Sequence, residues 1–294
     1  MNGKAKLAIG AALAAALTFL AYSFFQNVNV PVLSPDGPIA EKERNLIYLA
    51  VGLSLIVVIP VYFMLVFFAW KYREGNKKAA YRPDFDHSRL IESIWWGVPL
   101  VIITILAIAT WKSSHELDPL RPLASNTKPL NIQVVALQWK WLFIYPDYNI
   151  ATTNHIVFPE KTPVKFSVTS DAPMNSFWIP QLGSQIYAMS GMSTTVHLQA
   201  DKIGAYQGSS ANISGEGFAE MAFVANSVAE KDFAEWVKLI RQYRYDLTYQ
   251  AYGKLAKPSR NNSVFYYSSV DPNLYHQVVK KYTSPSRSLV GGAL

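Results

Sequence analysis

The chain has 294 residues, of which 50% are hydrophobic and 16% are charged. This composition is too apolar for an ordinary soluble domain and too polar for membrane helices alone, so we expect a few spans and one globular domain. The net charge of +7 does not indicate nucleic-acid binding, because the basic residues form no long tract and many of them flank apolar runs.

The first apolar run, Leu7–Phe25, is uncharged and follows Lys4 and Lys6. A basic start and an apolar middle are typical of an export signal. Residues 21–23, Ala-Tyr-Ser, form a poor small-x-small cleavage site. Residues 1–25 are therefore expected to be either a cleaved signal peptide or an uncleaved signal anchor, and the sequence leaves both alternatives open.

Two further runs, Leu46–Trp70 and Ser93–Trp111, are each long enough to cross a membrane. A helix rises about 1.5 Å per residue and the hydrocarbon core is roughly 30 Å thick. The second run reaches this thickness with room to tilt, and the third, which has Trp95 and Trp96 near its start, just about reaches it. With a short loop between them, these spans predict an antiparallel helical hairpin within residues 26–112.

The loops on either side of the second run differ in their content of basic residues. Residues 26–45 hold only Lys42 and Arg44. The loop between the spans is rich in basic side chains, namely Lys71, Arg73, Lys77, Lys78, Arg82 and Arg89. Because positively charged loops stay in the cytoplasm, we expect the 71–92 loop inside and everything after Lys112 outside.

Residues 113–129 contain three prolines and little periodicity, which predicts a linker. Residues 130–226 then hold short apolar runs punctuated by Gly and Pro, with no helical pattern between them, and this is typical of a β-sandwich or barrel. The expected strands are 130–137, 139–145, 163–170, 175–180 and 194–199.

The pattern changes near residue 226. Ser227 followed by Glu230 matches a capping box, and Phe233, Val237 and Ile240 fall at helical spacing. Residues 227–294 are rich in tyrosine and basic residues. One interpretation is a small helical extension that packs on the β domain, and the other is a docking surface for a partner subunit. The tail after Ser284 is expected to be disordered.

The sequence offers little to bind a metal in the exported domain. It has no cysteine, which excludes disulfides, a lipid-modified N-terminal cysteine and thiolate metal sites together. None of its five histidines shares a metal-ligand spacing with another, and His197 is expected on the outward, solvated face of its strand. Phosphate-loop, nucleophile-elbow and paired-carboxylate motifs are also absent from the sequence.

Glu92 is an ionisable residue at the cytoplasmic threshold of the third run, directly before Ser93. Such a residue is often functional. The alternative is a carboxylate that only sits among the lipid headgroups, and position alone does not decide between the two.

The combination of these features resembles subunit II of the haem–copper respiratory oxidases. The hairpin, the positive inner loop and Glu92 before Trp95 and Trp96 agree with that family. The stretch QWKWLFIYP at 138–146 is similar to its aromatic segment, and MNSFWIPQLGSQIYAM at 174–189 is similar to its quinol-oxidising branch. The resemblance covers about residues 30–282. It implies that residues 130–226 form a cupredoxin-like β-sandwich and that residues 227–294 form an aromatic-rich extension.

Members of the family that oxidise cytochrome c carry a two-copper centre in this domain. At the matching positions this sequence has no thiolate, imidazole or carboxylate. Those positions hold Asn175, Ser210, Asn212, Ser214 and Phe218, while Met221 is retained. Serine hydroxyls stay protonated and bind copper poorly, and a lone methionine is a weak ligand that is more simply a core residue. We therefore interpret the copper site as lost.

The resemblance then implies subunit II of a bo-type ubiquinol oxidase in the bacterial inner membrane, with its β domain in the periplasm. The complex would oxidise ubiquinol, reduce oxygen to water and move protons. Haem and copper would lie in subunit I, and this chain would bind no cofactor or nucleic acid. Its partners would be subunit I, the other subunits and the bilayer. Glu92 would lie at the cytoplasmic entry of a proton pathway, and the chain itself would hold no catalytic residue.

Two rival functions stay open at this point. A copper-bearing cytochrome c oxidase subunit is disfavoured by the substituted ligand positions. A membrane-tethered cupredoxin-like binding or assembly protein would need neither a carboxylate at the membrane nor a large partner interface. Residues 139–145, which relay electrons in copper-bearing relatives, are expected to act only in packing here.

Overall fold

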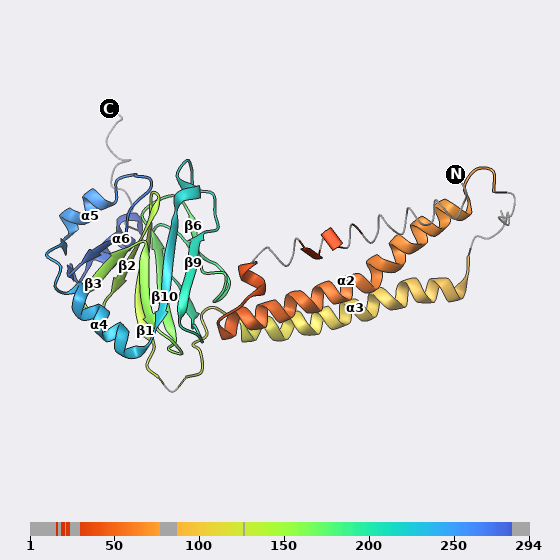
Figure 1. Cartoon of the computed structure of the whole chain (residues 1–294), viewed down its shortest axis with the longest axis horizontal. Coiled ribbons are helices and arrows are strands. Elements are labelled where there is room, and N and C mark those ends of the chain that lie inside the picture. Colours follow the sequence, from red (N-terminus) through yellow and green to blue (C-terminus); the bar gives the residue numbers. More distant parts are fainter. Residues whose placement is uncertain are drawn as a thin grey trace, which may run out of the picture.

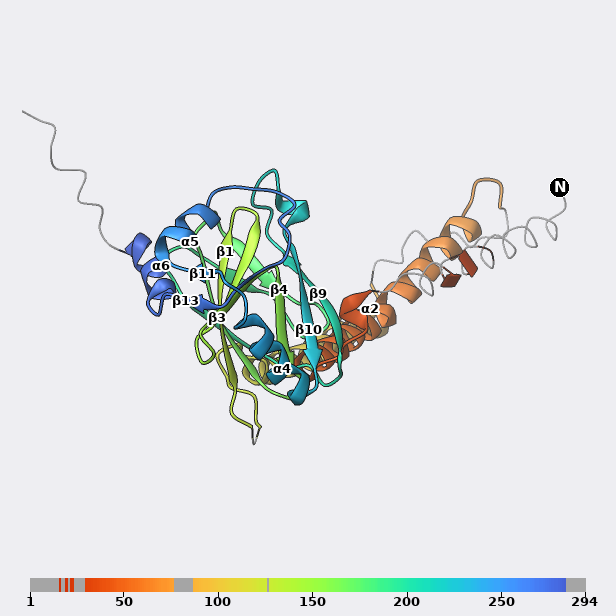
Figure 2. The ribbon, with the colours of Figure 1, turned by 60° about the vertical axis from the view of Figure 1, so that its left-hand side comes forward.

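The computed structural model describes residues 30–76, 87–125 and 127–283, with residues 16, 19, 20, 22 and 23 of the first apolar run. The tail after Ser284 and most of the expected 1–25 segment lie outside these residues. Two long helices project from one side of a β-sandwich, and the C-terminal helices lie on its opposite side (Figure 1). The second view shows the same separation (Figure 2).

The projecting helices are α2 (Pro38–Lys71) and α3 (Arg89–Glu116), preceded by the short helix η1 (Pro31–Leu33). Among the described residues they are the two helices that are long and apolar enough to cross a membrane, with mean hydropathies of 2.6 and 2.0. Their large apolar side chains are mostly exposed, as Phe63 at 69% and Trp96 at 76% illustrate. A soluble protein would bury such surface, so these helices require lipid or a partner.

The sandwich consists of two sheets, and all five predicted strands are present. The first sheet has the order β12 (Phe265–Tyr267), β3 (Ile150–Thr153), β2 (Lys140–Tyr145), β1 (Leu130–Leu137), β5 (Val164–Ser170), β8 (Thr194–Leu198). The second has the order β4 (His155–Pro159), β10 (Ala222–Val228), β9 (Gly204–Ser210), β6 (Asn175–Trp178), β7 (Ile186–Ala188). Each sheet contains one parallel pair, β1 with β5 and β4 with β10.

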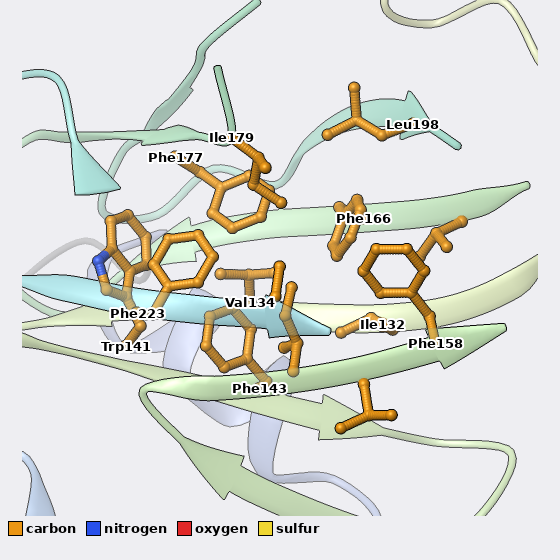
Figure 3. Close-up of a cluster of buried hydrophobic side chains, with 14 of the residues drawn as sticks. Ile132, Val134, Trp141, Phe143, Phe158, Phe166, Phe177, Ile179, Leu198 and Phe223 are labelled. Carbon is orange, nitrogen blue, oxygen red and sulfur yellow. The ribbon is translucent and has the colours of Figure 1, made fainter. Parts of the chain in front are cut away.

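The space between the sheets is filled by aromatic rings (Figure 3). Phe177 of β6 lies at the centre of this cluster. Its ring centroid is 5.2 Å from that of Phe223, 5.0 Å from that of Phe166 and 5.7 Å from that of Trp141. Trp141, Phe143 and Tyr145 alternate with other buried residues along β2 and are fully buried. The expected packing role of the 139–145 segment is thus confirmed for these three rings.

The C-terminal region forms α4 (Glu230–Ile240), α5 (Tyr249–Leu255) and α6 (Leu274–Thr283), together with the short pair β11 (Asp246–Leu247) and β13 (Ser269–Val270). Phe233, Val237 and Ile240 are buried, as their helical spacing predicts. The predicted capping box is wrong. Ser227 pairs within β10, and α4 is capped by Ala229 without a side-chain hydrogen bond, because strand pairing with β4 and β9 continues to the end of β10.

Helices α5 and α6 of the extension pack on the outer face of the first sheet. A second cluster of buried side chains joins β1, β2 and β3 to α5 and α6, namely Val135, Leu137, Leu142, Ile144, Ala151, Leu247, Tyr252, Val270, Leu274, Tyr275 and Val278. The side chain of Asp171, which follows β5 and is 1% exposed, accepts hydrogen bonds from Tyr252, Lys281 and Tyr282. The packing interpretation of this region agrees with the structure, because its apolar faces are buried against the sandwich.

His197 is not the solvated residue that strand alternation predicts. It is 7% exposed, and its Nδ1 lies 3.0 Å from the carbonyl oxygen of Pro119. The segment that follows α3 folds back against β8 and covers the strand's outer face. Alternation along one strand contains no information about a distant segment that covers it.

His155 gives the domain a pH-dependent stability. Its ring contacts Asn226 of β10, Tyr266 of β12 and Trp236 of α4, and burial lowers the pKa of its imidazole. A histidine whose folded pKa is depressed contributes stability above its unfolded value of about 6.5, and this contribution is lost as the pH falls through that value. We expect the free energy of unfolding to decrease on acidification from pH 7.5 to 5.5.

Denaturant titrations of the full chain in detergent across this pH range measure the effect. His155→Gln is expected to flatten the pH dependence. The matched control is His276→Gln, which removes an exposed histidine on α6. An equal slope in His155→Gln and in the unaltered protein would contradict the prediction.

Candidate functional site

The positions that the resemblance assigns to lost copper ligands come together at one end of the sandwich. Asn175 begins β6 and Ser210 ends β9, and the other four lie in the connection from β9 to β10, which contains the short helix η2 (Phe218–Glu220). Backbone hydrogen bonds join the two regions, since the amide of Ala211 donates to the carbonyl oxygen of Ser176 at 3.0 Å. Strand pairing therefore brings these residues close together in space, although they are far apart in the sequence.

The hydroxyl of Ser210 is the centre of a polar network. It donates toward Oδ1 of Asn175 at 3.0 Å or the carbonyl oxygen of Asn212 at 3.1 Å, and it accepts from the amide of Ser176 at 3.3 Å. The hydroxyl of Ser176 donates to Oδ1 of Asn212 at 3.2 Å. Asn175 and Ser210 are 0% and 5% exposed, so their polar groups bond with one another in place of water.

Ser214 lies at the edge of the Trp139 indole. The indole Nε1 donates to its carbonyl oxygen at 3.1 Å, while its own hydroxyl is buried without a hydrogen-bond partner. Gly217 allows the close approach, because a Cβ atom there would lie 2.4 Å from the indole. Arg260 covers the ring with its guanidinium 5.5 Å from the ring centroid and forms an ion pair with Glu216.

Met221 and Phe218 are the last two of the six positions that match copper-site residues in the family. Met221 is 1% exposed and packs within the main core cluster. Its carbonyl oxygen accepts a 3.4 Å bond from the Trp141 indole, and its amide donates to the carbonyl oxygen of Phe218 at 3.0 Å.

The chemistry of this site does not fit copper. Its polar atoms are hydroxyls, amides and backbone groups, whereas copper favours thiolate and imidazole ligands. In the part of the chain that the structure describes, no three His, Cys, Asp or Glu side chains gather in a way that could hold a metal ion. The side-chain oxygens of Asn175, Ser210 and Asn212 are engaged in the network of hydrogen bonds around Ser210.

Lys140 was not singled out by sequence reasoning, although a lysine between two tryptophans in a buried strand is an unusual pattern. It is 3% exposed, and its ammonium donates to the carbonyl oxygens of Leu255 and Lys257, each at 2.9 Å, and to the hydroxyl of Ser259. Burial lowers its pKa. These bonds tie the 255–259 segment of the extension to the aromatic strand, beside Trp139.

Glu92 lies in the first turn of α3, far from this site at the opposite end of the hairpin (Figure 1). Its Oε1 accepts a hydrogen bond from the amide of Ser88, the N-cap residue, at 3.2 Å. A carboxylate there is stabilised by the positive end of the helix dipole. Its side chain is partly exposed.

Three family models match the chain in order. The transmembrane domain of cytochrome c oxidase subunit II matches residues 31–112, its periplasmic domain matches residues 149–228, and the aromatic-rich motif matches residues 241–286. The periplasmic domain of subunit II of cytochrome oxidase from Bradyrhizobium japonicum covers 39% of this chain and 96% of its own, at 25% identity and a TM-score of 0.37.

Curated relatives align over most of both chains. "Cytochrome bo(3) ubiquinol oxidase subunit 2" of Pseudomonas putida is 51% identical over 92% of this chain and 86% of its own. "Ubiquinol oxidase subunit 2" of Acetobacter aceti is 48% identical over 86% of this chain and 83% of its own. "Quinol oxidase subunit 2" of Bacillus subtilis is 34% identical over 90% of this chain and 83% of its own.

A hairpin of apolar helices that carries a cupredoxin-like sandwich defines a class of membrane-anchored β-domain proteins. Within that class, the matches over both domains show that the chain belongs to the subunit II family of haem–copper oxidases, in the group of the ubiquinol oxidase subunit 2 proteins.

Proposed function

We propose that this chain is subunit II of a bo-type terminal ubiquinol oxidase, with its helices in the bacterial inner membrane and its β domain in the periplasm. The complex oxidises ubiquinol, reduces oxygen to water and translocates protons. The high identity to ubiquinol oxidase subunit 2 proteins carries this proposal. The basic residues next to the inner ends of α2 and α3 support the orientation.

The electron donor follows from the chemistry of the β domain. A water-soluble donor needs a metal relay outside the membrane, whereas a quinol can reach the haem-bearing subunit from within the bilayer. The hydroxyl and amide groups of Asn175, Ser210 and Asn212 bond with each other and are poor copper ligands. In this proposal, haem and copper reside in subunit I and electrons do not pass through this chain.

The five segments of the chain have separate roles in the proposal. Residues 1–25 direct export or anchor the chain, residues 26–112 form the hairpin that contacts subunit I, and residues 113–129 connect it to the sandwich. Residues 130–226 cover the outer face of subunit I. Residues 227–294 stabilise the sandwich through the second buried cluster and the contacts of Lys140.

Glu92 is proposed as a proton-entry residue for the complex. It is an ionisable side chain at the end of α3 that the positive-inside rule places in the cytoplasm, and it is held at the helix N-terminus by the amide of Ser88. There it can take up protons from the cytoplasm and pass them to a pathway in subunit I.

Purification of the chain from native membranes tests the assignment. We expect a haem-bearing partner to co-purify, with a haem absorption spectrum and ubiquinol-dependent oxygen consumption that cytochrome c does not replace. Copper analysis of the chain after separation from its partners is expected to find none. A tethered binding or assembly protein would be isolated without haem, and that result would overturn the proposal.

A further inference from the structure

A hollow of about 930 Å³ lies where the outer ends of α2 and α3 meet the sandwich. Its walls come from the first turns of α2, the last turn of α3, the segment after α3 and strand β8. Leu46, the first residue of the uncharged run in α2, lines it from one side, and Ser113 lines it from the other. The hollow therefore lies between the hydrocarbon and the aqueous phase, at the level of lipid headgroups.

Charged groups of both signs line this hollow. Lys42 and Arg121 are the cations, and Glu43, Glu116 and Asp118 are the carboxylates. The ammonium of Lys42 lies 3.2 Å from Glu116, and both side chains are more than half exposed. With two cations against three carboxylates, the lining does not favour a purely anionic ligand. It suits a headgroup that has both a phosphate and an ammonium.

Glu43 keeps acceptor capacity for such an ammonium. Its Oε1 accepts bonds from the amide and the hydroxyl of Ser184, at 3.1 and 2.7 Å. Both bonds use the same oxygen, so Oε2 is left to accept others. These contacts fix the carboxylate between α2 and the sandwich, at the wall of the hollow.

An apolar groove continues from the hollow along α3. It has a volume of about 420 Å³ and is lined by one face of the helix, namely Ile103, Leu106, Ala107, Thr110, Trp111 and Ser114. Ser114 lines both the groove and the hollow. Over the residues from 103 to 114 the helix rises about 16 Å, so the groove follows the depth of one leaflet.

We propose that the hollow and the groove together bind one glycerophospholipid whose headgroup contains a phosphate and a primary ammonium. Lys42 and Arg121 face the phosphate, Glu43 and Asp118 face the ammonium, and an acyl chain lies along the α3 groove. An apolar partner helix would fill the groove but would offer no charged group to the hollow. A lipid of this class satisfies both parts with one molecule.

The experiment uses the complex purified from native membranes and washed extensively in detergent. Retained phospholipids are extracted and counted per protein by mass spectrometry. We expect one phosphatidylethanolamine per chain to survive washing. Lys42→Gln combined with Arg121→Gln is expected to reduce it about tenfold, a loss of about 1.4 kcal/mol in binding. The control Lys112→Gln removes a cation at the same depth that does not line the hollow.

A second variant, Ala107→Phe, fills the groove without changing charge and is also expected to release the lipid, so the test does not depend on the charge variants assembling. Absence of retained lipid in the unaltered complex, equal retention in all variants, or retention of phosphatidylglycerol or cardiolipin instead would each overturn the proposal. The readout is lipid content, so these outcomes leave the proposed oxidase function to be judged by its own test.

Discussion

Phe177→Ala is expected to lower the free energy of unfolding of the β domain by about 3–5 kcal/mol, the usual cost of truncating a buried phenylalanine. Phe177 is 1% exposed and its ring lies among those of Trp141, Phe143, Phe166 and Phe223. Truncation removes apolar contact from both sheets at once and leaves a cavity that the rigid aromatic neighbours fill poorly.

Denaturant unfolding of the full chain in detergent, followed by tryptophan fluorescence, measures this loss. The matched control is Phe265→Ala in β12, whose ring is 40% exposed and contacts Tyr245 and Tyr267. That variant is expected to cost only about 1 kcal/mol. Equal losses in the two variants would show that Phe177 is not the centre of the core.

Glu92→Gln in the assembled oxidase is expected to reduce turnover at least about tenfold, because a positioned proton-transfer group contributes a factor of this order or more. The amide of glutamine still offers an oxygen to the amide of Ser88, so the start of α3 is preserved while the ionisable proton carrier is lost. The loss is therefore expected in oxygen consumption and proton pumping, with subunit content and haem spectrum unchanged.

The control for this experiment is Glu74→Gln. Glu74 is an exposed carboxylate in the loop after α2, on the same side of the membrane in the proposed orientation. It is expected to leave turnover unchanged. If Glu92→Gln also retains full turnover and proton pumping, Glu92 is a headgroup-level carboxylate and the proton-entry role is excluded.

Strand positions were well predicted where one strand face is apolar. In β5, Val164, Phe166 and Val168 alternate with Lys165 and Ser167, and this pattern survives folding because one face meets the core. Strands such as β9, with the sequence Gly-Ala-Tyr-Gln-Gly-Ser-Ser, offered no such signal. Gly208 is required there because a Cβ atom would lie 2.1 Å from the ring of Phe223, and a requirement of this kind depends on the partner strand.

The polar site was only half predictable. The residue types at 175, 210, 212 and 214 indicated that copper ligands were missing, but not what the replacements do. The structure gives them a joint role, since the buried hydroxyl of Ser210 bonds with Asn175 and Asn212. Buried polar groups need partners, and which partners are in reach is decided by the pairing of β6 with β9.

The membrane hairpin, the β class of the outer domain and the absence of thiolate ligands could be predicted from the amino-acid sequence, because hydrophobic run length, alternation and residue type act locally. The tertiary structure alone decided what covers each surface. The segment after α3 buries His197, and the extension covers the outer sheet face and secures Lys140. The physical reason is that burial and hydrogen bonding depend on segments distant in sequence, whose approach is fixed only when the sheets pair and pack.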